Sequence, residues 1–482
     1  MSLLQHARTC LANQVANKSY NAFISRATEE QLLRVVPDGE NASTQRPLEG
    51  KLIAIKDNIC TTDFPTTAAS RILHEFPSPY DATVVSKLRD AGGVVAGKTN
   101  LDEFGMGSHS IHSHVGPVSQ PSSMEHGEGQ LSVGGSSGGS ALAVATDQCW
   151  ASLGTDTGGS VRLPAAYTGV YGFKPSYGLL SRWGVLAYAN SLDTVGILAK
   201  DVDSVKSLFH AVNGYDKKDP TSLAESSRRR ITELVEQRKR SGRYRIGVPK
   251  EYNTSGIDPK IKSAWRATLK ALQSKGHSIH PVSLPATKLA LPAYYVLAPA
   301  EAASNLAKYD GVRYGTRSSG PDTSGGVLFS QTRSEGFGDE VKRRILLGNY
   351  SLSAEAIDNY FIQAQKVRRL VQRDFDGVFS LRNSLVDEGG DGEGEGERVD
   401  ALLVPTAPTL PPLVKDVKRQ DPVAAYMNDV FTVPTSLAGL PAISVPVKTD
   451  HGAARSQIGM QIISQYGDDE LVLEIAQCLS ES

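Results

Sequence analysis

The stretch Gly134-Gly-Ser-Ser-Gly-Gly-Ser140 is followed, after the small residues 141–145 and a predicted strand, by Gly154-Thr-Asp-Thr-Gly-Gly-Ser160. Both loops combine glycine with serine, and glycine is dense throughout residues 127–184. Glycine loses much conformational entropy on folding, so a dense glycine block in an ordered chain indicates tight turns or close approach of the backbone to a ligand. Apolar residues of a predicted helix and strand flank both loops directly, which excludes a flexible linker.

The chemistry that suits such loops is acyl transfer by a serine nucleophile. The Gly-Lys-Ser/Thr ending of a P-loop and the Gly-x-Gly-x-x-Gly dinucleotide motif are absent from them. Backbone N–H groups of a glycine turn can converge on the oxyanion of a tetrahedral intermediate. The serine needs a base, and a lysine can serve if burial lowers its pKa from about 10.4 toward neutrality. Lys56, which ends the apolar run 52–55 and precedes Asp57 and Asn58, is the best candidate.

Strand and helix patterns alternate near the N-terminus. Lys51–Ile59 reads as a buried strand, Thr83–Ala91 as a helix closed by Gly92, and Val94–Gly97 as another short strand. Strands that alternate with helices indicate an α/β sheet. A strand that ends in polar residues, as the first of these does at Lys56, Asp57 and Asn58, often delivers them to a site.

Two segments stand apart from this pattern. Residues 1–30 form a predicted N-terminal helix, and because the first acidic residue is Glu29 they also have the basic character of an organellar targeting segment. Residues 386–400 hold seven acidic residues and five glycines, with almost nothing apolar. Such a composition cannot bury enough surface to order itself, which predicts a flexible surface insertion.

Composition excludes several classes of protein. The 482 residues include 51 basic and 52 acidic side chains, so the net charge of −1 provides no general attraction to nucleic acid. The four cysteines lack the spacing of a disulfide framework or a zinc site. His109, His112, His114 and His126 lack the carboxylates or thiolates that would complete a metal site. No apolar stretch reaches the roughly 18 residues of a membrane-spanning helix.

The two loops, together with Arg162, Pro164, Gly169, Gly172 and Lys174-Pro175, resemble the amidase signature family. The resemblance extends over nearly the whole chain and implies one domain, residues 1–482, with a large mixed β-sheet covered on both faces by helices. It also implies a catalytic triad of Ser160 as nucleophile, Ser136 as a bridging serine after a cis peptide bond, and Lys56 as base. The oxyanion hole would consist of the backbone N–H groups of Thr157, Gly158, Gly159 and Ser160.

Within this family the chain most resembles the glutaminase subunits that supply ammonia for converting Glu-tRNA(Gln) to Gln-tRNA(Gln), in an organellar, fungal-type form. That subgroup implies a clamp for free glutamine, for which Tyr294, Arg344 and Asp429 match best. Tyr295 or Arg343 are alternatives. An arginine suits the α-carboxylate of glutamine and an aspartate suits its α-ammonium group.

The resemblance further implies a B subunit that binds the tRNA, ATP and Mg²⁺, a small third subunit of C or F type, and a mitochondrial location. No cofactor or metal is expected in this chain. A stand-alone amidase for another small amide and a catalytically silent scaffold stay open as alternatives. Val133 departs from the family's usual proline, and the approach to it over residues 120–131 is unusually polar.

Overall fold

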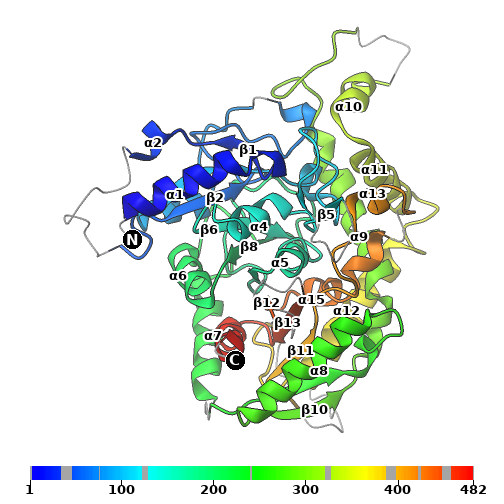
Figure 1. Ribbon diagram of the computed structural model, residues 1–482. Helices are drawn as coiled ribbons and strands as arrows, with labels where there is room; N and C mark the ends of the chain where they lie inside the picture. The colour runs from blue at the N-terminus through cyan, green and yellow to red at the C-terminus, as the bar shows by residue number, and fades with distance from the viewer. Residues whose placement is uncertain are drawn as a thin grey trace.

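The computed structural model describes residues 3–33, 46–74, 76–121, 129–238, 242–320, 327–386, 398–421, 425–447 and 458–480 (Figure 1). Eleven strands form one sheet in the order β1-β3-β2-β6-β8-β7-β12-β13-β11-β9-β10, and β4 and β5 pair separately. The strands are β1 Phe23–Arg26, β2 Leu52–Lys56, β3 Val94–Thr99, β4 Ser119–Pro121, β5 Gln130–Ser132, β6 Ala151–Asp156, β7 Tyr171–Lys174, β8 Thr194–Ala199, β9 Arg245–Pro249, β10 Ser278–Val282, β11 Ala401–Pro405, β12 Ala442–Pro446 and β13 Gly459–Ser464.

The helices alternate with the strands over much of the chain. They are α1 Leu3–Ala16, α2 Glu29–Leu33, α3 Thr83–Asp90, α4 Gly138–Ala145, α5 Arg162–Thr168, α6 Val202–Val212, α7 Glu225–Gln237, α8 Pro259–Ser274, α9 Ala290–Asn305, α10 Ser330–Gly336, α11 Asp339–Ser351, α12 Phe361–Val378, α13 Val414–Val417, α15 Val433–Ala438 and α16 Asp469–Ser480. The strand that ends in Lys56 and the helix and strand that follow are present. The N-terminal helix predicted over residues 1–30 ends at Ala16, because the turn residues from Asn17 to Asn21 break it, and β1 lies in the rest of that range.

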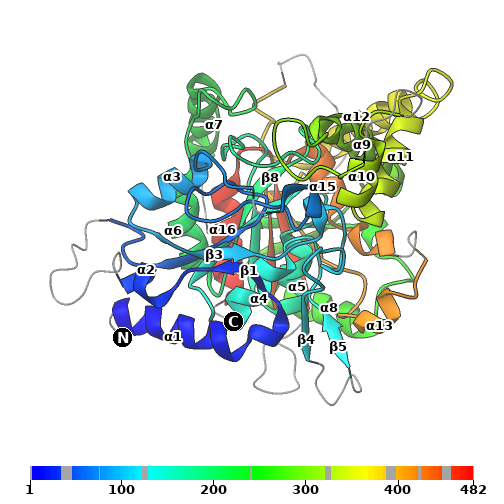
Figure 2. The ribbon, with the colours of Figure 1, turned by 90° about the horizontal axis from the view of Figure 1, so that it is seen from above.

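The sheet is mixed and helices cover both of its faces, as the sequence predicts. β2 runs parallel to β3 and β6, whereas β8, β7, β12, β13 and β11 follow one another in antiparallel pairs. Successive residues of a strand point to opposite faces. On β7, a Cβ on Gly172 would lie 2.4 Å from Ala165 of α5, while the ring of the next residue, Phe173, contacts Phe209 of α6 at 5.3 Å. Helices α5 and α6 therefore pack on opposite faces of the sheet, which Figure 2 shows from above.

The topology brings the two halves of the site to one edge of the sheet. Because β2 and β6 are parallel neighbours, their last residues, Lys56 and Asp156, emerge at the same edge, where ligands of α/β sheets commonly bind. Helices α9, α11 and α12 pack together beside this region (Figure 1). They carry Tyr294 and Arg344, so residues far apart in the sequence meet at the ends of β2 and β6.

Parts of two predictions fall outside the described residues. Of the acidic insertion 386–400, residues 387–397 are not described, so it stays a prediction. Of the polar stretch 120–131, the described ends form the antiparallel pair of β4 with β5. Val133, which follows β5, is fully buried. In the described part of the chain, no helix has the length and apolar character needed to cross a bilayer.

Candidate active site

Lys56 meets the first glycine-serine loop at the end of β2. Its Nζ lies 2.8 Å from Ser136 Oγ, 2.8 Å from Ser137 Oγ and 2.9 Å from Thr155 Oγ1. The side chain has no exposed surface and forms no ion pair with any described residue. Lys98, on the neighbouring strand, is equally buried but pairs with Asp57 at 3.2 Å. In the sequence Lys56-Asp57, the amine of Lys56 therefore bonds serine hydroxyls, and the carboxylate of Asp57 pairs with Lys98.

Burial lowers the pKa of Lys56 to about 7, because the ammonium form loses its hydration; the charges of Asp102, Asp156 and Asp193 partly oppose this shift. At neutral pH a substantial fraction of this amine is therefore unprotonated. A neutral amine 2.8 Å from a serine hydroxyl can accept its proton. The electrostatics of the site are those that a lysine base requires.

The first loop presents Ser136 to the lysine through a tightly packed turn. The Gly135–Ser136 peptide bond is cis. A Cβ on Gly135 would lie 2.2 Å from Asp102 Oδ2, so no larger residue fits there. Asp102 accepts hydrogen bonds from the backbone N–H groups of Ser110, Ile111 and His112 at 2.8–3.0 Å. Asp102 and its loop therefore form the wall against which the cis turn packs.

Ser160 lies on the second loop, immediately beside the first. The backbone N–H of Ser137 donates to the carbonyl of Ser160 at 3.0 Å, which ties the two loops together. Ser160 is 9% exposed, and its Oγ makes no hydrogen bond with any described residue. The Lys56–Ser136 contact of the predicted triad is thus formed, while the hydroxyl of Ser160 is uncommitted. The three catalytic roles themselves stay predictions.

The turn from Thr157 to Ser160 contains a row of unused backbone donors. Among the described residues, none of these four N–H groups has an acceptor. The next two, of Val161 and Arg162, donate to Asp156 Oδ2 at 3.1 and 3.4 Å. Buried backbone donors are nearly always paired, so four free ones beside a serine are the arrangement expected of an oxyanion hole.

Several residues that local sequence did not assign to the site hold this turn in place. Arg162 is fully buried and pairs with Asp156 at 2.8 Å, and it also donates to Gln461 Oε1 at 2.6 Å and Ser436 Oγ at 2.8 Å. Thr432 Oγ1 donates to the carbonyl of Gly158 at 2.7 Å. Since C=O and N–H point in opposite directions across a trans peptide, Thr432 fixes the direction of the next N–H donor.

The predicted clamp residues gather next to this turn. A Cβ on Gly158 would lie 2.7 Å from the hydroxyl of Tyr294, so the α9 tyrosine packs directly on the nucleophile loop. Asp429 accepts from Ser108 Oγ at 2.7 Å and from Tyr295 Oη at 3.0 Å. Arg344 of α11 donates to Tyr188 Oη at 2.7 Å, and its guanidinium lies 5.6 Å from the ring centre of Tyr295.

The alternatives for the clamp differ in their surroundings. Arg344 is 3% exposed and faces the tyrosines, whereas the side chain of Arg343 is 43% exposed and pairs only with Glu340 among the described residues. The structure therefore favours Arg344. Tyr294 is buried against Gly158, and the half-buried Tyr295 donates to Asp429. Both tyrosines line the site, so the choice between them stays open.

Buried charges of both signs thus lie against the tyrosines that pack on the loop of Ser160. Burial raises the pKa of Asp429 to about 6, so this carboxylate is ionised at neutral pH. The guanidinium of Arg344 is paired through Nε with Glu340 at 2.8 Å, and Tyr188 holds a second nitrogen. A ligand that carries a carboxylate and an ammonium group would complement this pair of charges. Free α-amino acids have those two groups.

A family model described as Amidase matches residues 7–473 of the chain. The chain belongs to the amidase family. It is 56% identical to the A subunit of the mitochondrial glutamyl-tRNA(Gln) amidotransferase of Coccidioides posadasii, over 100% of this chain and 99% of that protein. It is also 54% identical to the corresponding mitochondrial protein of Ajellomyces capsulatus, which has the same name, over 99% of each.

Solved structures of the family are similar throughout the chain. The crystal structure of the A subunit of glutamyl-tRNA(Gln) amidotransferase from Thermotoga maritima matches with a TM-score of 0.72 and 33% identity, covering 100% of this chain and 94% of that one. A crystal structure described as an amidase matches with a TM-score of 0.74 and 26% identity, covering 100% and 96%. The mixed sheet and its helical layers are therefore those of this family.

The described histidines of this amidase lie apart from any cluster of metal-ligating side chains. In the described residues, no cluster of three or more His, Cys, Asp or Glu side chains could hold a metal ion. His109 lies between Ser132 Oγ at 2.9 Å and Asn428 Nδ2 at 3.1 Å, and burial lowers its pKa to about 4. His109 is thus a neutral, hydrogen-bonded core residue. His126 lies outside the described residues.

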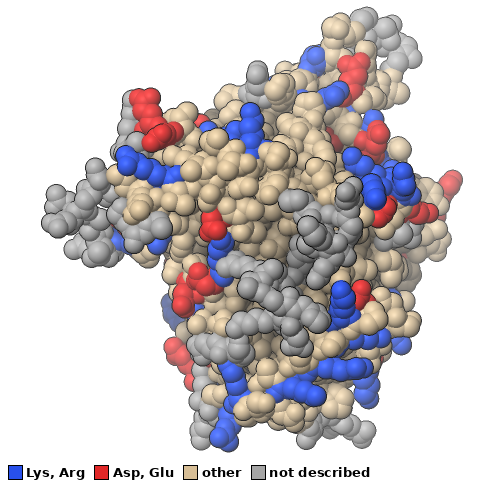
Figure 3. All heavy atoms as spheres, in the orientation of Figure 1, with Lys and Arg blue, Asp and Glu red and all other residues tan. Residues whose placement is uncertain are grey.

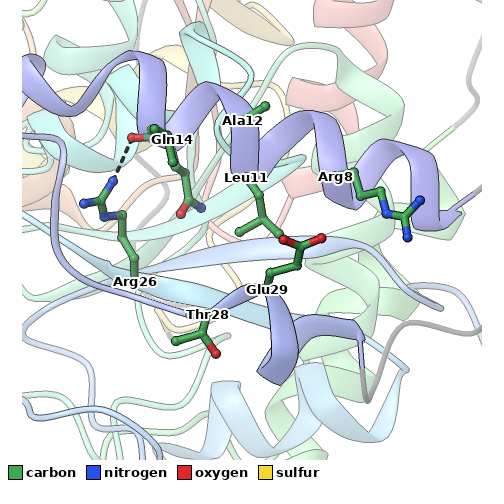
Figure 4. A pocket seen from close by; sticks show the side chains of 9 residues that line it. Arg8, Leu11, Ala12, Gln14, Arg26, Thr28 and Glu29 are labelled. Carbon is green, nitrogen blue, oxygen red and sulfur yellow. Dashed lines mark hydrogen bonds between the residues drawn. The ribbon is translucent and has the colours of Figure 1, made fainter.

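A separate groove of about 490 Å³ lies between α1 and the segment 26–29 (Figure 4). Arg26 and Arg8 lie toward its two ends, with Leu11 and Glu29 between them (Figure 4). Arg26 Nη1 donates to the carbonyl of Gln14 at 2.8 Å, which fixes that end. None of the predicted site residues lines this groove. The predicted site residues lie instead at the sheet edge formed by the ends of β2 and β6.

Proposed function

We propose that this amidase is the glutaminase subunit of a mitochondrial glutamyl-tRNA(Gln) amidotransferase. The observation that carries the proposal is that buried Arg344 and Asp429 both lie against Tyr295. The ring of Tyr295 packs on Tyr294, which in turn packs on the loop of Ser160. A general amidase for apolar amides would place an apolar channel there. The names of the curated relatives, at 52–56% identity over nearly full length, support the same function and the same compartment.

The residues of the site suit hydrolysis of the glutamine side-chain amide. Neutral Lys56 accepts the proton of Ser136, and Ser136 accepts the proton of Ser160 as the oxygen of Ser160 attacks the amide carbon. The backbone N–H groups of Thr157–Ser160 stabilise the resulting oxyanion. The relay returns a proton to the departing ammonia, and an acyl ester remains on Ser160. Water then cleaves this ester by the same relay and releases glutamate.

The clamp residues account for the choice of glutamine. Arg344 would bind the α-carboxylate and Asp429 the α-ammonium group, with Tyr294 or Tyr295 packed against the substrate. Glutamine and asparagine share these two groups but differ by one methylene. A clamp fixed next to the loop of Ser160 therefore places the amide of only one of them at the nucleophile.

The proposed function also requires partner subunits. Ammonia released at Ser160 would pass to a B subunit that binds Glu-tRNA together with ATP and Mg²⁺, and a small third subunit of C or F type would join the two. Acidic and basic side chains intermingle over much of the face in Figure 3, apart from a row of basic residues over α8. With a net charge of −1, this chain suits a small zwitterion while the partner holds the RNA.

The decisive experiment replaces the nucleophile in the complete complex. The variant Ser160→Ala should abolish amidation of Glu-tRNA with glutamine, while ammonium chloride still supports it. Ser464→Ala provides a matched control, since Ser464 is a buried serine whose hydroxyl bonds the carbonyl of Asp468 at 2.7 Å, on β13. That control should retain both activities.

Three other outcomes would contradict the proposal. If Ser160→Ala abolished amidation with glutamine and with ammonium alike, the chain would do more than supply ammonia. If the wild-type complex hydrolysed glutamine and asparagine equally well, a general amidase would be the better description. Unchanged amidation from glutamine by Ser160→Ala would leave only a scaffold role.

A further inference from the structure

Asp193 lies between the oxyanion turn, which is residues 157–160, and Tyr188, which contacts the predicted clamp residue Arg344. It immediately precedes β8, whose first residue, Thr194, pairs with Asp156 at the end of β6. Asp193 is 4% exposed, and both of its oxygens accept hydrogen bonds. It takes no part in the proton relay.

One oxygen of this carboxylate holds the oxyanion turn. The hydroxyl of Thr157 donates to Asp193 Oδ1 at 2.7 Å. Thr157 is the first of the four residues whose backbone N–H groups have no acceptor in the described protein. Asp156 and Thr432 hold the later part of the same turn. The contact with Asp193 is thus the side-chain anchor at the beginning of the oxyanion turn.

The other oxygen holds the residue that positions the clamp arginine. Asp193 Oδ2 accepts from the backbone N–H groups of Tyr188 and Ala189 at 2.9 and 3.0 Å. The hydroxyl of Tyr188 in turn accepts from Arg344 at 2.7 Å. A continuous path of short contacts therefore runs from Thr157 through Asp193 and Tyr188 to Arg344.

We propose that Asp193 is a positioning residue that couples the oxyanion turn to the substrate clamp through a single carboxylate. It touches neither substrate nor nucleophile, and it acts through Thr157 on one side and Tyr188 on the other. Both oxygens are required, because each half of the site uses one of them. The clamp half of this inference rests on the proposed function, whereas the oxyanion half does not.

The surroundings of Asp193 suit this role. Burial raises its pKa to about 6, while Arg182 and its bonds to Thr157 and Tyr188 favour the ionised form and Glu301 opposes it. Asp193 is therefore ionised at neutral pH and accepts through both oxygens. Its charge is also one of those that raise the pKa of Lys56. Replacing this carboxylate should therefore lower the pKa of Lys56 as well as displace the oxyanion turn.

A matched control distinguishes positioning from simple stability. Asp469 is 3% exposed, and it accepts the backbone N–H and the hydroxyl of Ser176 at 2.8 and 2.6 Å. Burial raises its pKa to about 6 as well. Asp469 begins α16 and bonds no residue of the site. Asp469→Asn should therefore reproduce the loss of a buried carboxylate without the effect on the reaction.

The first measurement is the steady-state hydrolysis of glutamine by the complete complex. Asp193→Asn should lower kcat about tenfold to a hundredfold, because displacing an oxyanion donor slows the reaction by up to about that factor. It should also raise KM about tenfold. Thr157→Val should lower mainly kcat, with Thr157→Ser restoring it, and Tyr188→Phe should raise mainly KM. The double variant of Asp193→Asn with Thr157→Val should lower kcat little more than Asp193→Asn alone, because both substitutions remove the same contact.

The second measurement needs no glutamine. A fluorophosphonate probe reacts with an activated serine: the Ser160 oxygen bonds to phosphorus, the P–F bond breaks, fluoride leaves, and the serine proton passes to Lys56 through Ser136. Asp193→Asn and Thr157→Val should slow this labelling about tenfold or more, and the midpoint of its pH profile should shift to lower pH in Asp193→Asn. Asp469→Asn should label at the wild-type rate.

The inference is overturned if Asp193→Asn labels at the wild-type rate and pH midpoint, or if Asp469→Asn slows labelling equally. If Asp193→Asn fails to fold, the labelling rates of Thr157→Val and Thr157→Ser decide whether the contact with Asp193 positions the oxyanion turn. A wild-type chain that labels at Ser160 but does not hydrolyse glutamine would refute the proposed function. The labelling rates would still decide the role of Asp193.

Discussion

Replacing Lys56 by methionine should stabilise the protein while abolishing its reaction. The amine has a pKa of about 7 in the folded chain, against about 10.4 when unfolded. Between these values the unfolded state binds one more proton, so the stability of the wild type rises with pH in this window. Below pH 7 the cost of burying the amine is fully present, and above about pH 10.4 it is gone.

The size of the effect follows from this difference in pKa. At pH 7 the buried amine costs about 4 kcal/mol, at about 1.4 kcal/mol per unit. Unfolding entropies of about 2.1 cal/mol/K per residue give about 1 kcal/mol/K for a chain of this length, so the cost corresponds to about 4 °C in Tm. The hydrogen bonds lost by Ser136, Ser137 and Thr155 reduce the gain by an amount that does not depend on pH. The advantage of Lys56→Met should therefore shrink as the pH rises from 7 to 9.

The assay is thermal unfolding of wild type and variants at several pH values, together with fluorophosphonate labelling. Lys174→Met is the matched control, because Lys174 is also buried with a pKa of about 7 but bonds only the carbonyls of Pro175 and Leu440 among the described residues. Both variants should show the same pH-dependent gain in Tm, while only Lys56→Met loses labelling. If the Tm of Lys56→Met followed the wild-type pH profile, Lys56 would be charged when folded and could not be the base.

Three further substitutions test separate parts of the site. Gly159→Ala should lower kcat about a hundredfold or more with KM little changed, because the residue has φ +146° and the new Cβ would lie 2.2 Å from Thr432 Oγ1, displacing the oxyanion donors. Arg344→Lys should raise KM for glutamine by about tenfold or more with a smaller change in labelling rate, since lysine cannot replace a planar fork. Arg162→Ala should reduce the unfolding free energy by about 3–5 kcal/mol, measured by urea denaturation, because it leaves Asp156 buried without its partner.

Much of the catalytic half of the site could be predicted from local sequence. An apolar run that ends in Lys56 places a lysine at a strand end, and glycine-serine loops indicate exposed backbone donors. The pairing of β2 with β6 then brings these features together. What local sequence could not show is the support of the turn by Thr432, which lies 274 positions from Gly158. Such a long-range contact depends on the whole topology.

The clamp shows a signal that sequence reasoning could have used. On α11 the buried residues include Val341, Arg344 and Gly348, which share one helical face by their spacing of three and four. Arg343 lies outside that row. The signal is partial, because Leu346 and Leu347 of the same helix are apolar but exposed. The roles of Arg162 and Asp193 had no comparable signal, because a charged residue is ordinarily exposed and only its partner explains its burial.

The most direct test of the mechanism is to identify the residue that carries the acyl group during turnover. The complex is mixed with glutamine, quenched in acid and digested, and the peptides are analysed by mass spectrometry. A γ-glutamyl ester on Ser160, absent from Ser160→Ala and from Lys56→Met, is the predicted result. Glutamate formation by the wild type with the ester on another residue, or continued hydrolysis by Ser160→Ala, would contradict it.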